Sequence, residues 1–407
     1  MTENIRVAFG SVPKDSGTFT FYRNQRPELL LQGIDMRCVS IGAHQGALWD
    51  KRYADDGCVL LAPHSRNLKR QARVFADWCE AEGIDIVIAV NSGPILSALP
   101  HLPEQIRVVS RCANAFEHGY RIAMSGSDRL SRIVALSPRL RDDLVADYGA
   151  DPEKLVLIPN GIDPAPFEAP AAITRGANET LTIGFLGRLE HNQKGVLHLP
   201  AIARAIAERG VRFNLRIAGD GRHEIRLRKE LSAEVKAGIV SFEGRIGPEE
   251  VPGFLASCDI FAFTSRFEGV PNALLEALMA GCIPVSFLIE GITDFVIEDG
   301  ESGMIVGQED IDGFAGAVEA LAANRMRLAA MGKAASRFAR DRFTASGCAE
   351  AYGAMFRKVM ADAPPAWDPK PWNDFVPDPN FPQSWRQYLP VGLENVIKKL
   401  RSRASGN

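Results

Sequence analysis

Short apolar runs separated by polar loops and helical stretches mark the first half of the chain. Runs this short that are apolar throughout are typical of parallel strands buried on both faces. They occupy residues 5–10, 36–42, 84–90, 106–110, 133–137 and 154–163. Helices are expected over residues 18–32 and from Pro138 onwards, where a strand gives way to a polar, periodic segment. This alternation predicts a parallel sheet with helices on both faces.

A second alternating set follows residues 163–179, which are rich in Pro, Ala and Gly and show no clear periodicity. We interpret that segment as a linker. The later strands are expected at residues 181–187, 214–219, 238–244, 260–265, 282–287 and 303–307. The chain therefore reads as two similar α/β sheets. Ligands of such sheets bind beyond the carboxyl ends of the strands, which directs attention to the loops that follow them.

Length and composition are those of an ordinary protein of two domains. At 407 residues, 46% hydrophobic and 24% charged, the chain is too long for one compact domain of usual size. The formal net charge of -3 argues against nucleic-acid binding, which normally shows a basic domain. No signal-peptide pattern and no apolar run of about 18 residues is visible, so we expect a cytoplasmic protein.

The seven cysteines give no sign of a metal or redox site. Their number is odd and no pair has C-x-x-C spacing. We expect reduced thiols in or near the core strands.

Residues 264–284, TSRFEGVPNALLEALMAGCIP, carry the most chemistry in the chain. Glu268 and Glu276 have seven residues between them, the first in a loop and the second in a helix. Pro271 is expected at the first helical position, because its fixed φ suits that position and its missing N–H costs nothing there. The first-turn amides, around Asn272, would then face an anion with the helix dipole behind them. Gly269 would let a ligand approach the backbone.

This segment resembles the E-x7-E motif of the retaining glycosyltransferases of group 1, a family-4-like group with the GT-B fold. Four further segments resemble the same family in the expected order. They are IPNGID (158–163), GFLGRLEHNQKG (184–195), RIAGDGRHEIRL (216–227) and VIEDGESGMIV (296–306). The resemblance is strong over about residues 130–345. It implies an α/β protein of two Rossmann-like domains, with parallel sheets facing a central cleft and a C-terminal helix crossing back to the first domain.

The resemblance implies a donor site in the second domain. Arg188 and Lys194 would hold the diphosphate of a nucleotide sugar, the first as a bidentate fork and the second as a point charge. Glu276 would accept the ribose hydroxyls, and Glu268 would act on the transferred sugar as a catalytic residue. The other donor-binding positions implied are Arg245, Gly269, Val270 and Asn272. For Glu268, a charge that complements the helix dipole is the alternative.

Two candidates fall in the first domain. Gly17 resembles the glycine-rich turn that approaches the donor phosphate, although Ser16 stands where the family often has a second glycine. His118 is the best match to the family's histidine near the donor sugar, but it follows the strand later than expected. Arg111 would share or replace its role. An ordinary turn and a structural histidine are the alternatives.

We expect no metal ion and no cofactor. The one D-x-D, Asp310 to Asp312, precedes an apolar-periodic helix and has the pattern of an N-cap with a first-turn acid. Arg188, Lys194 and the helix N-terminus would offset the diphosphate charge without a divalent ion. Neither 216–227 nor the loop after residue 10 contains a full G-x-G-x-x-G dinucleotide motif.

The last stretch, from about residue 364, is rich in proline and contains Trp367, Trp372 and Trp385. One interpretation is an ordered strap held on the surface by its tryptophans. The other is a contact with acceptor, membrane or a second subunit. The final ENVIKKLRSRA has four cations and one Glu, which would favour anionic lipid.

These features together predict three regions. Residues 1–163 form an acceptor-binding domain, 164–343 a nucleotide-sugar-binding domain, and 344–407 a crossover helix and tail that pack on the first domain. The predicted function is metal-independent, retaining transfer of a hexose from a nucleotide sugar to a glycan, lipid-linked or protein acceptor, in polysaccharide biosynthesis. A nucleotide-sugar epimerase, a phosphorylase with pyridoxal, and a non-catalytic sugar-nucleotide-binding scaffold remain alternatives. A dehydrogenase rests on fold analogy alone.

Overall fold

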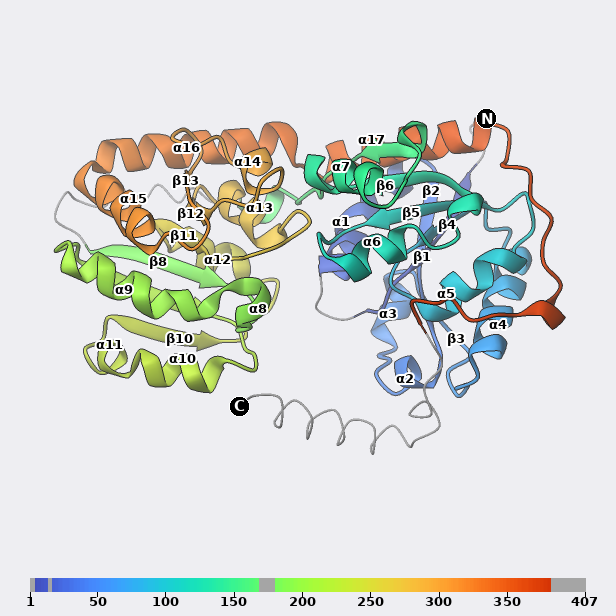
Figure 1. Cartoon of the computed structure of the whole chain (residues 1–407), viewed down its shortest axis with the longest axis horizontal. Coiled ribbons are helices and arrows are strands. Elements are labelled where there is room, and N and C mark those ends of the chain that lie inside the picture. The colour runs from blue at the N-terminus through green and yellow to red at the C-terminus, as the bar shows by residue number, and fades with distance from the viewer. Residues whose placement is uncertain (1–3, 14–16, 168–179, 382–407) are drawn as a thin grey trace. The chain divides into compact units, whose positions relative to one another are not determined.

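A computed structural model describes residues 4–13, 17–167 and 180–381 (Figure 1). The chain divides into two compact units. Unit 1 contains residues 1–161 together with 345–407, and unit 2 contains residues 162–344. Residues 345–381 thus return to the first unit in sequence.

Unit 1 is built on a seven-stranded parallel sheet with strand order β3-β2-β1-β4-β5-β6-β7. The strands are β1 (Ile5–Gly10), β2 (Ile34–Ile41), β3 (Cys58–Leu61), β4 (Ile86–Ala89), β5 (Arg107–Cys112), β6 (Leu130–Ala135) and β7 (Leu155–Leu157). All six predicted strands of this half are present. The sequence analysis missed β3, a four-residue edge strand whose side chains are mostly half-buried.

Helices flank this sheet (Figure 1). They are α1 (Gly17–Leu31), α2 (Ala43–Gly46), α3 (Arg52–Asp55), α4 (Leu68–Ala81), α5 (Gly93–Ala98), α6 (Glu117–Ala123), α7 (Pro138–Ala146) and α17 (Ala345–Ala361). The prediction that a helix begins at Pro138 is confirmed, with Ser137 capping it through a hydrogen bond from the Leu140 amide.

Helix α17 is the expected late helix, and it packs on α1 of unit 1. Tyr352 and Phe356 are fully buried on its inner face. The Tyr352 ring lies 5.2 Å from that of Phe21 on α1, centroid to centroid. Removing this helix would therefore expose aromatic surface at the centre of unit 1.

Unit 2 has a six-stranded parallel sheet with strand order β10-β9-β8-β11-β12-β13. The strands are β8 (Leu181–Leu186), β9 (Phe213–Ala218), β10 (Val240–Gly244), β11 (Ile260–Phe263), β12 (Ile283–Phe287) and β13 (Met304–Val306). The helices are α8 (His191–Lys194), α9 (Leu199–Glu208), α10 (Glu224–Glu230), α11 (Ser232–Lys236), α12 (Val251–Ala256), α13 (Asn272–Met279), α14 (Thr293–Val296), α15 (Ile311–Ala323) and α16 (Arg325–Arg342). All six predicted strands are found.

In both units the parallel strands are covered by helices, and the core consists of the strand and helix faces between them. The change of direction in strand order, between β1 and β4 in unit 1 and between β8 and β11 in unit 2, is the doubly wound arrangement. The carboxyl ends of β8 and β11 lie side by side there, so their loops are the natural place for a ligand.

The tail is ordered as far as the structure describes it. Trp372 stacks on His101 with ring centroids 4.2 Å apart, and the Lys370 amide donates to the Pro100 carbonyl over 2.9 Å. Trp367 lies 5.2 Å from the Arg129 guanidinium. Residues 364–381 therefore form a surface strap on unit 1. Trp385 and the basic ENVIKKLRSRA segment lie outside the described residues, as does most of the predicted linker, 168–179.

Candidate active site

The segment after β8, residues 187–195, packs with its backbone directly against the backbone of the loop after β9. Gly219 has a φ of +135°, and a Cβ there would lie 1.9 Å from the Gly187 carbonyl oxygen. Only glycine permits both the conformation and the approach. The Gly187 amide also donates to the Ala218 carbonyl over 3.1 Å. We refer to residues 187–195 as the β8–α8 segment.

The same segment is fastened to the loop after β11. Gly195 ends α8 with a φ of +63°, and a Cβ there would lie 2.0 Å from the Thr264 carbonyl oxygen. The Thr264 hydroxyl donates to the Lys194 carbonyl over 2.8 Å, and the Arg266 amide donates to the Gln193 carbonyl over 2.8 Å. These contacts bring the two sequence motifs of unit 2 together at one edge of the sheet.

Lys194 and Glu268 form a largely buried ion pair at the centre of this arrangement. The Lys194 Nζ lies 2.6 Å from the Glu268 Oε1, with side-chain exposures of 19% and 7%. A buried carboxylate requires such a partner. The predicted diphosphate-binding lysine and the predicted catalytic glutamate are therefore in direct contact, 74 residues apart in sequence.

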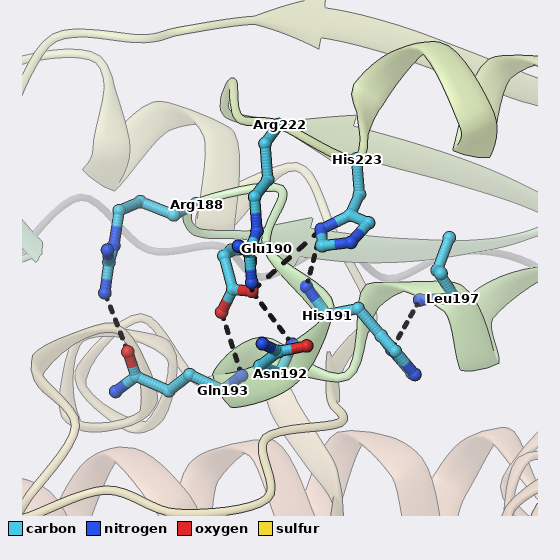
Figure 2. Close-up of polar contacts among 8 residues, drawn as sticks. All are labelled: Arg188, Glu190, His191, Asn192, Gln193, Leu197, Arg222 and His223. Carbon is cyan, nitrogen blue, oxygen red and sulfur yellow. Dashed lines mark hydrogen bonds and ion pairs between the residues drawn. The ribbon is translucent and has the colours of Figure 1, made fainter. Parts of the chain in front are cut away.

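Gln193 completes a chain of four side chains. Its Nε2 donates to the Glu268 Oε2 over 3.3 Å. Its Oε1 accepts from the exposed Arg188 Nη2 over 2.7 Å, as Figure 2 shows. Two cations and one carboxylate leave this cluster with a formal charge of +1. The sequence analysis missed Gln193. Its position next to Lys194 in the matched motif was the only available signal.

Helix α13 begins one residue later than predicted. Pro271 is extended, with φ -77° and ψ 115°, and occupies the N-cap, so Asn272 is the first helical residue. A ψ of 115° lies outside the helical range, so Pro271 precedes the helix; Gly269 and Val270 before it are buried. The Pro271 carbonyl accepts from the Leu274 and Leu275 amides. The earlier amides of a helix have no acceptor within it, which suits an anion at this N-terminus.

Glu276 lies in α13 and is partly buried. Burial raises the pKa of its carboxyl group to about 7 from the ordinary 4.5. No hydrogen bond or ion pair to this carboxylate is found among the described residues. A partly buried acid without a protein partner has unused capacity to accept hydroxyl donors from a ligand.

The remaining predicted donor residue, Arg245, lies just beyond the carboxyl end of β10 and is exposed. Asp310 acts as expected for an N-cap, since its carboxylate accepts from the Gly313 amide over 2.8 Å at the start of α15. Asp312 pairs with Arg209. All seven cysteines are buried and free, as predicted.

Gly17 and His118 belong to unit 1 and are not part of the cluster described above. Gly17 is the exposed first residue of α1. His118 is exposed on α6, with its ring 6.0 Å from that of Phe381 in the strap. Arg111 is buried at 3% exposure, where it lies 4.1 Å from the Phe21 ring and donates to Tyr352 and Asn160. These contacts with α1 and α17 make Arg111 a structural residue of unit 1.

Comparison with known families identifies the fold. Residues 180–324 match the family model of group 1 glycosyl transferases, and residues 43–166 match that of Glycosyltransferase Family 4. The chain therefore carries a group 1 glycosyl transferase domain at residues 180–324 and a Glycosyltransferase Family 4 domain at residues 43–166. Its two Rossmann-like units are those of the GT-B fold. The matched region of unit 2 contains the whole cluster from Arg188 to Glu276.

Two of the curated relatives illustrate the range of the family. The chain is 27% identical over 260 residues to a 2-deoxystreptamine glucosyltransferase of Streptomyces kanamyceticus, a match covering 58% of this chain and 66% of the relative. It is 30% identical over 194 residues to a GDP-mannose:cellobiosyl-diphosphopolyprenol alpha-mannosyltransferase of Xanthomonas oryzae pv. oryzae, covering 47% and 49%. The matches thus span from about half to two thirds of these relatives.

Solved structures share the fold at low sequence identity. A glycosyltransferase from Rickettsia africae has a TM-score of 0.72 at 13% identity, covering 89% of this chain and all of that one. Anabaena Alr3699/HepE, solved in complex with UDP and glucose, has a TM-score of 0.70 at 18% identity, covering 87% of this chain and all of that one. Within the described ranges, no helix is long and apolar enough to cross a membrane.

Proposed function

We propose that this glycosyltransferase moves a hexose from a nucleoside-diphosphate sugar to an acceptor hydroxyl with retention of configuration and without a metal ion or other cofactor. The observation that carries the proposal is the cluster of Arg188, Gln193, Lys194 and Glu268 beside the N-terminus of α13. It combines cations, helix amides and a carboxylate at one sheet edge, the groups that a sugar diphosphate requires.

Each group in the cluster has a role that follows from its surroundings. Arg188 is exposed and has further guanidinium donors beyond the one that contacts Gln193, so it is suited to clamp phosphate oxygens. Lys194 is held in place by Glu268, which makes it a fixed charge for the developing negative charge of the leaving diphosphate. Glu276 would accept the ribose hydroxyls.

Glu268 would orient the transferred sugar and stabilise the cationic transition state. Its two oxygens accept hydrogen bonds from Lys194 and Gln193. This arrangement favours electrostatic stabilisation over attack by the carboxylate as a covalent nucleophile. We therefore favour front-face substitution. The bond from the anomeric carbon to the phosphate oxygen breaks, the bond to the acceptor oxygen forms on the same face, and the acceptor's proton passes to the departing phosphate.

Unit 1 would supply the acceptor site, and in it His118 would contact the donor sugar and the Gly17 turn would approach the donor phosphate. The names of curated relatives support a glycan or lipid-linked acceptor, since two of them act on undecaprenol-linked or polyprenol-linked saccharides. Polysaccharide biosynthesis at the cell envelope is the setting that we propose. A role for nucleic acid has no support in the charge of the chain.

Thermal unfolding with UDP, GDP, ADP and NAD tests the donor site. Saturation at about one hundred times the dissociation constant should add about 2.7 kcal/mol to the free energy of unfolding. We expect one nucleoside diphosphate to give this shift and NAD to give none. Arg188→Ala should abolish the shift, whereas Arg327→Ala, which changes an exposed arginine of unit 2 far along the sequence, should retain it.

The same preparation then separates transfer from the alternatives. Release of nucleoside diphosphate only when acceptor is present would establish transfer. Conversion of the sugar nucleotide without release would indicate an epimerase. If no diphosphate shifts the unfolding temperature, the donor-site proposal is wrong. A shift without any release or conversion of the sugar nucleotide would indicate the non-catalytic scaffold.

A further inference from the structure

Side chains of the protein itself accept hydrogen bonds from the first-turn amides of α8. The Glu190 carboxylate accepts from the Asn192 amide over 3.0 Å and from the Gln193 amide over 2.9 Å. The imidazole Nδ1 of His223 accepts from the His191 amide over 3.1 Å (Figure 2). Because these three consecutive donors are satisfied, the start of α8 is a fixed structural element and offers no vacant anion site.

A second histidine accepts a backbone hydrogen bond at the other end of α8. The Nδ1 of His191 accepts from the Leu197 amide over 3.3 Å, across the turn that contains Lys194 and Gly195 (Figure 2). An imidazole nitrogen accepts a hydrogen bond only when it carries no proton. Both His191 and His223 must therefore be neutral, with the proton on Nε2, for α8 to keep this geometry.

The surroundings of the two rings favour the neutral form. Burial lowers the pKa of His191 and of His223, and nearby positive charges lower both further. Glu190 opposes this at His223, but its own pKa is lowered by backbone donors and Arg222, so it stays ionised. The charged and titratable groups facing the pair are Arg222 and Arg226 at α10, Arg266 after β11, His198 after α8, and Glu190 at the start of α8. Glu309, before α15, faces His198 and Arg266.

Helix α8, which these hydrogen bonds hold, contains residues of the proposed diphosphate-binding site. Gln193 and Lys194 are the last two residues of α8, and they reach Glu268 and Arg188 through the contacts given above. A site of this kind needs side chains held to within a fraction of an ångström by the groups around them. Loss of the acceptors for the His191 and Leu197 amides would remove one backbone hydrogen bond at each end of α8.

We propose that His191 and His223 are positioning residues that hold the β8–α8 segment in its donor-binding geometry and release it on protonation. This inference rests on the proposed function, because it assigns the segment to the donor diphosphate. A histidine acts here as a hydrogen-bond acceptor for the backbone, and acid would convert that acceptor into a donor facing an N–H group. Donor binding should then weaken as pH falls below the ordinary histidine range.

The variants His223→Asn and His223→Ala separate the role of His223 as a hydrogen-bond acceptor from the effect of its protonation. The Asn Oδ1 stands near the place of the imidazole Nδ1 and accepts without titrating, whereas Ala removes the acceptor. At about pH 8, we expect Ala to weaken binding of the stabilising nucleoside diphosphate about fivefold or more, and Asn to restore most of it. His64→Asn, at an exposed histidine of unit 1, is the matched control.

The pH profile gives the sharper result. Between about pH 8 and about pH 5.5, wild-type affinity should fall about tenfold more than that of His223→Asn. Glu276 titrates in the same window and is retained in both proteins, so its contribution cancels in the comparison. Equal pH profiles for wild type and His223→Asn, together with unchanged affinity in His223→Ala, would overturn the proposal.

Hydrogen exchange without any ligand keeps the test independent of the proposed function. After correction for intrinsic rates, acidification should speed exchange of a peptide spanning residues 189–198 by about tenfold in wild type and much less in His223→Asn. If no nucleotide binds but exchange behaves in this way, the proposed donor site is wrong and the histidine linkage stands. If a nucleotide binds but exchange is the same in both proteins, the histidine linkage is wrong.

Discussion

At the scale of single residues, the site depends on two acids in different environments. Glu268 is 6% exposed and is compensated by Lys194 and Gln193. Glu276 is partly buried and has no partner within the described part of the chain, so its pKa rises to about 7. The first acid is therefore built into the protein's own network, and the second keeps its acceptor capacity for a ligand. Each difference leads to a separate prediction.

Glu268→Gln should lower kcat about a hundredfold while changing the donor KM much less, because the lost charge acts on the transition state. Leaving Lys194 without its carboxylate should also cost about 1–3 kcal/mol in the free energy of unfolding. Steady-state kinetics and urea unfolding measure the two effects. Glu301→Gln, at an exposed position, is the control. Unchanged turnover in Glu268→Gln would remove that residue from the mechanism.

Glu276→Gln should stabilise the protein above neutral pH and weaken nucleotide binding. The folded pKa of about 7 lies above the ordinary 4.5, so the folded state binds more protons between these values. The stabilisation from protonated Glu276 is complete below the ordinary pKa and is lost as pH rises through about 7. At about pH 8 the variant should gain about 1–2 kcal/mol, and at about pH 5 almost nothing.

Urea unfolding at the two pH values, with and without nucleotide, checks this prediction. A stabilised variant with normal nucleotide affinity would show that Glu276 is a buried acid without a role in donor binding. A variant with no gain at high pH would show that the carboxylate is better solvated than its position in α13 implies.

At the scale of elements, the strand predictions succeeded where burial on both faces gives an unbroken apolar run, as in β4 and β11. They missed β3, an edge strand whose four residues are all apolar but whose side chains are mostly half-buried. The start of α13 was misplaced by one residue because Pro is acceptable both as N-cap and as first helical residue. The difference lies in the ψ of Pro271, 115°, which sequence spacing does not specify.

The strap at residues 364–381 should stabilise unit 1 without affecting the donor site. Trp372→Ala removes the stack on His101, and we expect a loss of about 1–3 kcal/mol in the free energy of unfolding. Trp372→Phe, which keeps an aromatic ring, should lose less. The thermal shift given by nucleotide should remain in both variants. Limited proteolysis near residue 370 should become faster in the Ala variant, and equal rates would contradict a stabilising contact.

At the scale of the whole molecule, the chain forms unit 1 from two distant segments and unit 2 from one. The junction is compact, because the Ile162 amide donates to the Phe343 carbonyl over 2.8 Å. Residues 161 and 345 are therefore close together. Unit 2 is continuous in sequence and has its own sheet and core, whereas unit 1 lacks the α17 layer until the chain returns.

A fragment of residues 162–344 should fold alone, and residues 1–161 should not. The fragment of residues 1–161 would expose the Phe21 ring on α1, which Tyr352 of α17 contacts in the whole chain. Joining residues 1–161 to 345–407 through a Gly/Ser linker of about four residues should restore folding, because the ends are neighbours. Calorimetry of the three proteins shows which of them unfold cooperatively. Cooperative unfolding of residues 1–161 alone would show that α17 is dispensable.

The amino-acid sequence by itself determined the fold class, the late helix, the buried thiols and the segments where the donor chemistry should lie. Those features depend on local patterns of apolar residues, glycines and caps, which are visible along a chain. Only the tertiary structure decided that Lys194 pairs with Glu268, that Gln193 links them to Arg188, and that His223 holds the start of α8. The physical reason is that hydrogen bonds and ion pairs act over a few ångströms, whereas these partners are separated by up to 75 residues of chain.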